Sequence, residues 1–538
     1  MKGHLRNNIW ILSFVFWSLA IQAQLYPSDK AVLRYTQIMF EYPQVANAVV
    51  YKIEIAKNVS GSFENNKVYS VQDSSIAHLV SNGLFFGNSY KWHYSAYSAG
   101  KKIFTSKDFT FEIIKTNLVT NFRANVSVFD SSKFDAGLIL LDNGVIIDRL
   151  GNLILVTDSF GVEKRDFSLT SNGTLTYIQT VSAYERTLNG DLIWKTKELK
   201  TEKEIINGYH HDLVKLNNGN YLVMCKVLEF NNPRFRKNLN EAIIELDANN
   251  NIVWLWKECV ELTDTITIKK THLNSIFLNE NRNKLFVSGR DINTIFRIDR
   301  ATSKIESCIG TSLNDASEHY PQNIFSGQHS AQLLENGNIL LFNNNTKSGK
   351  NSVSSILEIK QPSRKSPNVV PQFGYIYMFD NPEDNFCEKG GDVNKLNNGN
   401  YLISSSANNR NFEITSSKKI VWQCRPEKLD TITKMWVPAS SYRINFSESL
   451  YPFYFTAQFN YQSGKVTGVK IVNEGSSDDQ YDIEIKDSKG KMILKEHLIV
   501  FKTKTVTIPL PKIVKKGYKL LVTSSNSTQT KELIFTKN

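Results

Sequence analysis

Three histidines lie at matched points of a repeated sequence pattern, and they are the residues best placed to do chemistry. His211 lies eight residues before Gly219 (219 − 211), and His329 lies eight residues before Gly337 (337 − 329). His272 begins a similar segment without the glycine and reaches its turn at nearly the same register. This spacing predicts that the three histidines open three equivalent β-strands.

A set of imidazoles can supply nucleophiles, acids and bases, or metal ligands. A metal site needs further ligands, but no carboxylate or cysteine accompanies all three histidines, because Asp212 follows only His211. Arg290 lies eighteen residues after His272 (290 − 272). Its guanidinium fork suits an oxyanion such as sulfate or phosphate, although an ion pair with Asp291 is an equally simple role. Taken with the histidines, the arginine favours oxyanion chemistry over metal binding.

A long repeat is predicted to bring these residues together. The histidine segments are separated by 61 residues (272 − 211) and 57 residues (329 − 272), and a further copy begins 62 residues later at Gly391 (391 − 329). A period of about sixty residues, made of strands and turns, is typical of a β-propeller. Residues 117–438 would supply five or six blades, and we predict six. Because the first strand of each blade lines the central channel, the histidines should face one space.

Both flanking segments are also predicted to be β-structure. Apolar and polar residues alternate around Tyr51 and Trp92 in residues 24–116, as in a fibronectin type III or immunoglobulin-like module. Residues 439–538 read as a smaller sandwich with a hairpin turn near Gly490. The predicted fold is therefore all-β, a six-bladed β-propeller flanked by N-terminal and C-terminal β-sandwich domains.

Composition narrows the class of protein. The chain has 538 residues, of which 41% are hydrophobic and 11% aromatic, so it should fold into several domains. The formal net charge is +12, but the basic residues are scattered and form no run interleaved with aromatic residues. A nucleic-acid-binding groove is therefore not predicted, while the positive charge would help an anionic substrate to approach.

The N-terminus has the features of a signal peptide over residues 1–23. Lys2 and Arg6 precede a short apolar stretch, and Ala23 provides a cleavage site before Gln24. No other segment is predicted to cross a membrane, so we expect a periplasmic or secreted protein. The five cysteines are far apart, have no metal-ligand spacing, and leave at least one thiol free.

Taken together in their order along the chain, the histidine and arginine motifs resemble those of the bacterial arylsulfotransferases, which do not use a nucleotide sulfate donor. The resemblance is clearest from about residue 205 to residue 350, and an N-terminal β-sandwich before a six-bladed propeller also resembles that family. The motifs that carry it are His211-Asp212 with the following Asn-Gly-Asn, His272-Leu273-Asn274-Ser275-Ile276, Ser288-Gly289-Arg290, and Gln328-His329-Ser330-Ala331.

The resemblance implies a role for each residue. His329 would be the nucleophile that becomes transiently sulfated. His211, His272 and Arg290 would hold the sulfuryl oxygens and assist proton transfer, and Asn274 would be a further substrate contact. The implied reaction is ping-pong transfer from an aryl sulfate donor to a phenolic acceptor, without a metal or a diffusible cofactor.

The chain also departs from the family pattern. It has no closely spaced cysteine pair, Lys269-Lys270-Thr271 precede His272, the segment Phe342-Asn343-Asn344-Asn345 lacks the acidic residue of the family, and the C-terminal domain is extra. A second class of function fits a propeller as well, namely a non-catalytic exported protein that binds a glycan or a protein partner. A homodimer is one of the assemblies that the sequence allows. A single pocket shared by the three histidines and Arg290 would favour the enzyme.

Overall fold

The computed structural model describes residues 25–535, except for residues 158–161, 230–239, 259–270, 311–317, 320–323, 348–351, 362–371, 380, 383, 463–464 and 512–513. The predicted signal peptide lies outside the described residues. Strands make up nearly all of the regular structure, and the α-helix α1 (Leu118–Asn121) has a single turn. The all-β prediction is confirmed.

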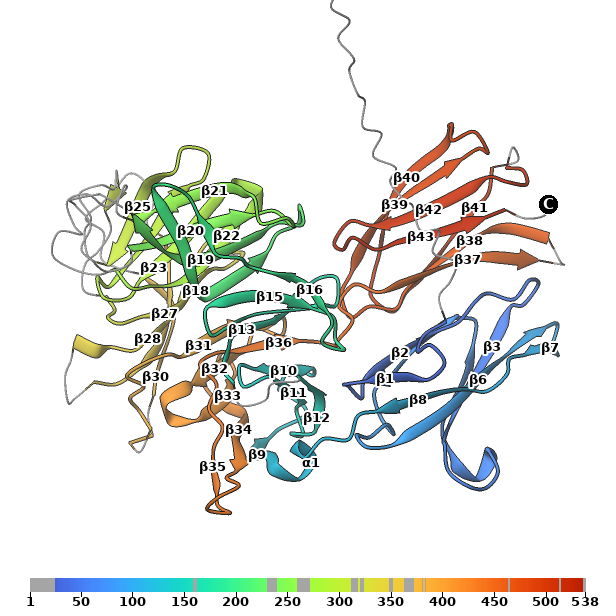
Figure 1. Ribbon diagram of the computed structural model, residues 1–538, viewed down its shortest axis with the longest axis horizontal. Helices are drawn as coiled ribbons and strands as arrows, with labels where there is room; N and C mark the ends of the chain where they lie inside the picture. Colours follow the sequence, from blue (N-terminus) through green and yellow to red (C-terminus); the bar gives the residue numbers. More distant parts are fainter. Residues whose placement is uncertain are drawn as a thin grey trace, which may run out of the picture.

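The N-terminal unit consists of two sheets that share one core (Figure 1). Alternate residues of the larger sheet, such as Tyr51 and Trp92, point inward, and Phe40 of the smaller sheet meets Trp92 with ring centroids 5.2 Å apart. That core continues into Leu155 and Tyr177 of the next domain, so the unit packs directly on it. The larger sheet contains β1 (Ala31–Leu33), β8 (Phe109–Ile113), β6 (Ser89–Ser98), β3 (Val50–Lys57), β4 (Lys67–Asp73) and β7 (Lys101–Thr105), and the smaller contains β2 (Ile38–Glu41) and β5 (Ala77–Val80).

Six sheets follow, antiparallel except for the parallel pair of β25 (Lys304–Gly310) and β26 (Glu318–His319), and consecutive strands of the chain are neighbours within each sheet, which is the connectivity of propeller blades. In chain order, the first blades contain β10 (Leu138–Leu141), β11 (Val145–Asp148) and β12 (Leu153–Val156); β13 (Lys164–Leu169), β14 (Leu175–Gln179), β15 (Ser182–Arg186) and β16 (Leu192–Lys195); and β17 (Leu199–Lys200), β18 (Glu204–Lys215), β19 (Tyr221–Glu229), β20 (Asn240–Leu246) and β21 (Ile252–Lys257). The later blades contain β22 (Leu273–Asn279), β23 (Lys284–Gly289), β24 (Thr294–Asp299), β25 (Lys304–Gly310) and β26 (Glu318–His319); β27 (His329–Leu333), β28 (Ile339–Asn343), β29 (Ser355–Ile359) and β30 (Phe373–Met378); and β31 (Asp392–Lys395), β32 (Tyr401–Ser405), β33 (Arg410–Ile414), β34 (Ile420–Leu429) and β35 (Trp436–Pro438).

The ring of blades is closed by strands from both ends of the domain. The C-terminal strand β36 (Ile444–Ser447) pairs with β10 and becomes the inner strand of the first blade, while β9 (Phe122–Phe129) pairs with β34 on the outside of the last blade. The inner strands β13, β18, β22, β27, β31 and β36 contact one another in this order, and β36 contacts β13 again. The predicted boundary at residue 438 is therefore wrong, because β36 ends nine residues later (447 − 438).

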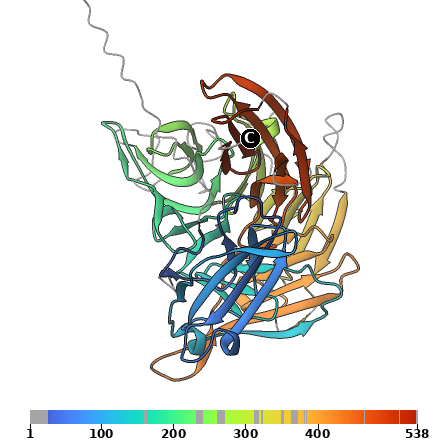
Figure 2. The same cartoon turned by 90° about the vertical axis from the view of Figure 1, so that its right-hand side faces the viewer.

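The C-terminal unit also has two sheets around one core, and in Figures 1 and 2 it lies beside the N-terminal unit on the same side of the propeller. Gly490 forms the predicted turn, since its N–H donates to Asp487 at 2.9 Å and its φ is 83°. The classification of the two flanking units as immunoglobulin-like sandwiches remains a prediction. The sheets contain β37 (Phe455–Gln462), β38 (Lys465–Asn473) and β41 (Thr505–Pro509), and β40 (Met492–Val500), β39 (Asp479–Lys486), β42 (Lys519–Ser524) and β43 (Thr530–Ile534).

Candidate active site

A ring of short polar side chains fixes the inner strands relative to one another. Five members each accept a hydrogen bond from a backbone N–H of the next inner strand, and that N–H belongs to the residue just after the next member of the ring. The bonds run from Leu213 to Asp166 (2.8 Å), from Ile276 to Asp212 (2.7 Å), from Ala331 to Ser275 (3.1 Å), from Val393 to Ser330 (3.4 Å) and from Ile444 to Asp392 (3.3 Å). Because one residue per blade takes part, the ring defines which positions of the six strands are equivalent.

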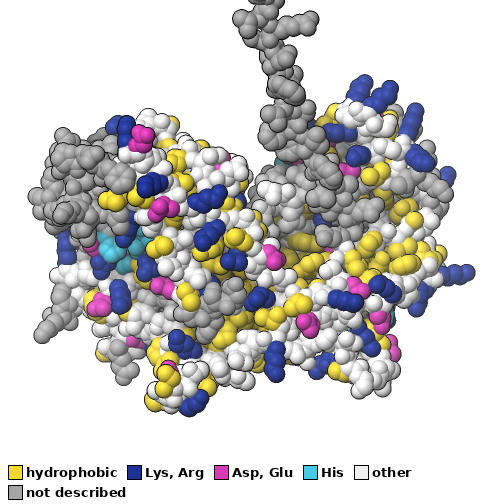
Figure 3. All heavy atoms as spheres, viewed as in Figure 1, with side chains coloured by type: hydrophobic (Ala, Val, Ile, Leu, Met, Phe, Trp, Pro, Cys, Tyr) yellow, Lys and Arg dark blue, Asp and Glu magenta, His cyan; other side chains and the backbone are white. Residues whose placement is uncertain are grey.

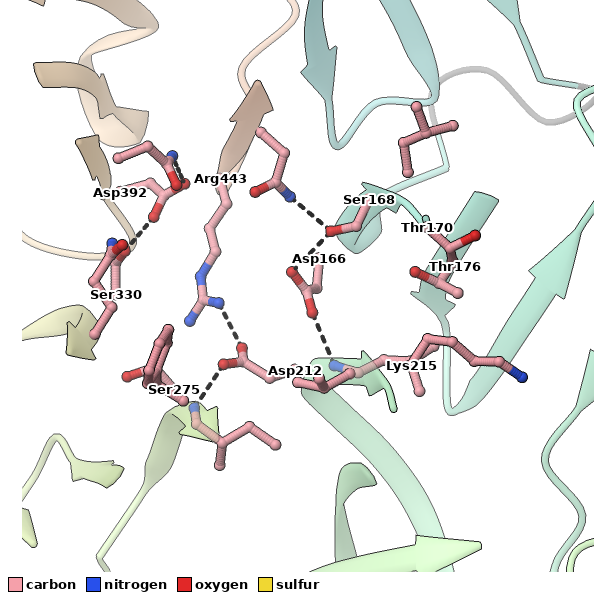
Figure 4. Close-up of a pocket in the computed structure, with 18 of the residues that line it drawn as sticks. Asp166, Ser168, Thr170, Thr176, Asp212, Lys215, Ser275, Ser330, Asp392 and Arg443 are labelled. Atoms are coloured by element: carbon pink, nitrogen blue, oxygen red, sulfur yellow. Dashed lines mark hydrogen bonds and ion pairs between the residues drawn. The ribbon is translucent and has the colours of Figure 1, made fainter. Parts of the chain in front are cut away.

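Arg443 occupies the sixth position of this ring, directly before Ile444. Its Nη1 donates to Asp212 Oδ1 at 2.5 Å (Figure 4). Its Nη2 donates to the carbonyl oxygen of Asn274. Burial alone would lower the pKa of this guanidinium, but the carboxylates of Asp212, Asp392 and Asp166 outweigh burial and raise it. Arg443 is therefore a fixed cation that ties three blades together at the axis.

The residues immediately before the ring members face the other end of the channel. They are Arg165, His211, Asn274, His329, Gly391 and Tyr442, one from each blade. The predicted equivalence of His211 and His329 is confirmed, but the predicted equivalence of His272 is wrong, because Asn274 holds that position. Each of the four inner strands β13, β18, β22 and β27 has an irregular register near this point, so counting residues along the chain does not identify equivalent positions.

The structure nevertheless brings the three histidines together. His211 and His272 have ring centroids 5.5 Å apart, and the ring of Tyr442 lies 6.0 Å from His211 and 5.7 Å from His329. His211 and His272 both have left-handed backbone conformations, with φ of 60° and 52°. These strained conformations aim side chains from different registers at one place, as is common at functional sites.

His329 is almost completely buried, and its hydrogen bonds define its tautomer. Its Nδ1 lies 2.7 Å from Asn344 Oδ1 and 3.0 Å from the carbonyl oxygen of Gly327. The amide of Asn344 cannot be turned round, because its Nδ2 donates to the carbonyl oxygens of Cys387 and Gly390, both at 2.8 Å. Two acceptors at Nδ1 require a proton there, so the neutral ring has a free electron pair at Nε2.

Electrostatics keep that ring neutral. Burial lowers the pKa of His329 to about 3, and the positive charges of Arg443 and Arg290 lower it in the same direction, while the bond to Asn344 raises it. Burial also lowers the pKa of His211 well below its usual value. His211 Nδ1 lies 2.7 Å from Nδ1 of His210, which leaves its Nε2 as the nitrogen available to a ligand.

His272 and Arg290 lie at the more open side of the site. The Arg290 N–H donates to the carbonyl oxygen of His272 at 3.0 Å, so β23 holds the two residues next to each other. Asp291 Oδ1 lies 2.8 Å from Arg290 Nη1 and 3.4 Å from His272 Nδ1, so the ion pair with Asp291 considered from the sequence is present. Burial lowers the pKa of His272, and Asp291 partly offsets this. Figure 3 shows histidine side chains reaching the surface beside Lys and Arg side chains.

Asn274 is buried, and it occupies on β22 the position that His329 occupies on β27. Its Nδ2 donates to the carbonyl oxygen of Gln328 at 2.7 Å, and its Oδ1 has no hydrogen-bond partner in the described part of the chain. The amide therefore links the strands that carry the site and keeps one acceptor free.

Sequence reasoning missed four residues of this region: Arg165, Asn344, Tyr442 and Arg443. Asn344 had been noted only as part of a segment that lacks the acidic residue of the family. Tyr442 and Arg443 lay beyond the expected end of the propeller, and Arg165 belongs to a blade whose repeat was poorly aligned. The segment that carries Tyr442 and Arg443 continues into Ser-Glu-Ser-Leu and lacks the Asn-Gly-Asn turn found at 218–220, 336–338 and 398–400, so the repeat pattern did not mark these two residues.

A cavity of about 400 Å³ lies on the other side of the polar ring, where Ser168, Thr170, Lys215 and Asn445 line it together with Arg443 (Figure 4). None of the predicted site histidines lines it. Within the described ranges, no group of three or more His, Cys, Asp or Glu side chains could hold a metal ion. No helix of the described chain has the length and apolar character needed to cross a membrane.

Comparison with known proteins supplies the family. No curated protein sequence matches the chain significantly. Similar solved structures include a protein of unknown function from Bacteroides caccae, with 14% identity and a TM-score of 0.37 over 58% of this chain and 98% of that one. A virginiamycin B lyase from Staphylococcus aureus has 13% identity and a TM-score of 0.32 over 56% and 88% of the two chains. The propeller domain of Swd1 from Myceliophteria thermophila has 11% identity and a TM-score of 0.32 over 61% and 96%.

These structural likenesses are too weak to support an argument about function. The family comparison is stronger, because the model described as "Arylsulfotransferase (ASST)" matches residues 124–443, which is 320 of the 538 residues (443 − 124 + 1). That span includes every residue of the candidate site and the polar ring up to Arg443. The chain belongs to the arylsulfotransferase family, a family of transferases.

Proposed function

We propose that the protein transfers a sulfuryl group from an aryl sulfate to a phenol through a covalent intermediate on His329. The observation that carries the proposal is the state of this imidazole, which is buried and neutral and holds its proton at Nδ1 against Asn344. The electron pair at Nε2 is then available to attack sulfur. Family membership supplies the chemical class of the reaction.

In the first half of the proposed reaction, His329 Nε2 forms a bond to sulfur while the bond between sulfur and the aryl oxygen breaks. We assign Arg290 and His211 Nε2 as the groups that hold the sulfuryl oxygens. His211 and His329 both contact the ring of Tyr442, Arg290 lies next to His272, and a preorganised donor costs no rearrangement. Asn274 is assigned as a further contact through its unpaired oxygen or through an intervening water.

His272 is assigned as the proton-transfer group, because it is more exposed than the other two histidines and has Asp291 beside it. The departing aryl oxide takes a proton from the protonated His272. In the second half, the phenolic acceptor returns a proton to His272 as its oxygen attacks sulfur and the N–S bond breaks. His329 is then neutral again, and no net proton is gained or lost.

We also propose that the protein is exported and acts in the periplasm or outside the cell. Support comes from the charged start, the short apolar stretch and the small residue at position 23. Aryl sulfates and phenols are then substrates met in that compartment.

The direct test is incubation with 4-nitrophenyl sulfate alone, followed by peptide mass spectrometry. We expect one sulfuryl group on the peptide that contains His329, together with a stoichiometric burst of 4-nitrophenol, and we expect both to disappear in His329→Asn. His497→Asn is the control, because His497 is an exposed histidine of the C-terminal unit paired with Asp482. A label on another histidine, or a burst that survives in His329→Asn, would show that the nucleophile has been misassigned.

A further inference from the structure

Arg165 is a cation of the site that the proposed reaction does not use. It lies on β13 directly before Asp166, at the position that His211 and His329 hold on their own blades. Asp166 has a left-handed φ of 54°, and the register of β13 shifts between Arg165 and Ser168. The local backbone therefore directs Arg165 toward the same end of the channel as the histidines.

The guanidinium of Arg165 stacks on an aromatic residue of the site. Its Cζ lies 4.8 Å from the ring centroid of Tyr442, and Tyr442 in turn contacts the rings of both His211 and His329. A guanidinium that stacks by its flat face keeps the N–H groups at its edge free for a planar acceptor. Tyr442 thus holds Arg165 in place without consuming its hydrogen-bond donors.

Those donors are only partly used. Arg165 Nε donates to Glu163 at 3.2 Å, and this ion pair is half exposed, with 34% and 51% of the two side chains accessible. Neither Nη1 nor Nη2 has a hydrogen-bond partner in the part of the chain that the structure describes. The two terminal nitrogens are therefore available to an incoming oxyanion.

Arg165 acts on a different part of the site from Arg290. Its charge is among those that lower the pKa values of His211, His272 and Tyr442. The charges that most lower the pKa of His329 are instead those of Arg443 and Arg290. Arg290 lies next to His272 through its backbone bond, whereas Arg165 lies over Tyr442, so Arg165 remains for a second negative charge further along the substrate.

We propose that Arg165 and Tyr442 form a subsite for a carboxylate carried by the aromatic substrate, so that the preferred acceptors are anionic phenols. This inference rests on the proposed sulfuryl transfer for its substrate class. The ring of the phenol lies against Tyr442, its hydroxyl points to His272 and His329, and its carboxylate accepts two hydrogen bonds from the guanidinium fork.

The test compares two acceptors of the same shape, 4-hydroxyphenylacetate and its neutral amide, 4-hydroxyphenylacetamide, with 4-nitrophenyl sulfate as the donor. The measured quantity is the ratio of kcat/KM for the anionic and neutral acceptors. We expect this ratio to fall by about tenfold or more in Arg165→Gln, because a charged pair of hydrogen bonds is lost. Arg165→Lys keeps the charge without the fork, so its ratio should lie between those of wild type and Arg165→Gln. Glu163→Gln, the control, removes only the competing carboxylate and should keep or raise the ratio.

Several outcomes would overturn the subsite. A similar loss with both acceptors would mean that Arg165 only supports the fold, which thermal unfolding of the same variants checks. If Arg165→Gln lost the burst of 4-nitrophenol with donor alone as fully as Arg290→Gln does, Arg165 would instead hold the sulfuryl group. If wild-type protein gave no burst at all, the proposed reaction would fail, and calorimetric binding of 4-hydroxyphenylacetate to wild type and Arg165→Gln would still decide the subsite: equal affinity refutes it.

Discussion

Replacing Asn344 by leucine tests whether the orientation of one imidazole controls the chemistry. Asn344 is fully buried, and leucine has the same number of side-chain heavy atoms with the same branching, so the change removes hydrogen bonds without leaving a cavity. His329 would lose the 2.7 Å bond at Nδ1 and keep only the carbonyl oxygen of Gly327 at 3.0 Å. The carbonyl oxygen of Gly390 would lose its donor, and that of Cys387 would keep only a 3.5 Å bond from Ser354 Oγ.

The two effects have different sizes and can be measured separately. During attack on sulfur the imidazole gains positive charge, so the bond to Asn344 changes from a neutral bond to one with a charged donor. Together with the loss of tautomer control, this should raise the barrier by about 2 to 3 kcal/mol, which is about 30- to 160-fold in rate. The loss of one hydrogen bond at each of these two buried carbonyl groups should also destabilise the fold by about 1 to 3 kcal/mol.

Asn473→Leu is the matched control. Asn473 is fully buried in the C-terminal unit, and its Nδ2 donates to the carbonyl oxygens of Ser477 and Val500, both at 2.9 Å. Both variants should lose stability, but only Asn344→Leu should slow the burst of 4-nitrophenol in single-turnover experiments with donor alone. A burst rate within threefold of wild type in folded Asn344→Leu protein would refute the orientation argument.

Four other predictions concern charge, acidity and processing. Arg290→Lys keeps the charge but loses the fork, so kcat/KM for an aryl sulfate should fall about tenfold or more, and unchanged turnover would remove Arg290 from the sulfate site. The pKa of His329 is lowered to about 3 in the folded chain, so as pH falls below 6.5 the unfolded chain binds a proton that the folded chain does not. The free energy of unfolding in urea should therefore fall between pH 7 and pH 5 by about 2 kcal/mol more in wild type than in His329→Asn. Asp291→Asn removes the charge that raises the pKa of His272, so the rise of the acceptor step with pH should move to lower pH, and an upward shift would contradict this. The exported protein should begin at Gln24, and N-terminal sequencing that finds residue 1 would exclude cleavage.

The sequence alone determined the class of fold and the family. Turn motifs and apolar alternation are local signals, since each depends on residues a few positions apart. They were sufficient for an all-β chain with a repeated propeller unit. The order of His211, His272, Arg290 and His329 was sufficient for the family, because a family motif is itself a sequence pattern.

Only the tertiary structure decided which residues meet. Register irregularities in the inner strands shift the side chains by different amounts on different blades, so Asn274, not His272, matches His211 and His329. Ring closure brings Tyr442 to His211 across 231 residues of chain (442 − 211), a contact that no local pattern encodes. The tautomer of His329 likewise depends on Asn344 and on two backbone carbonyl oxygens from the following blade, which meet only when the blades pack.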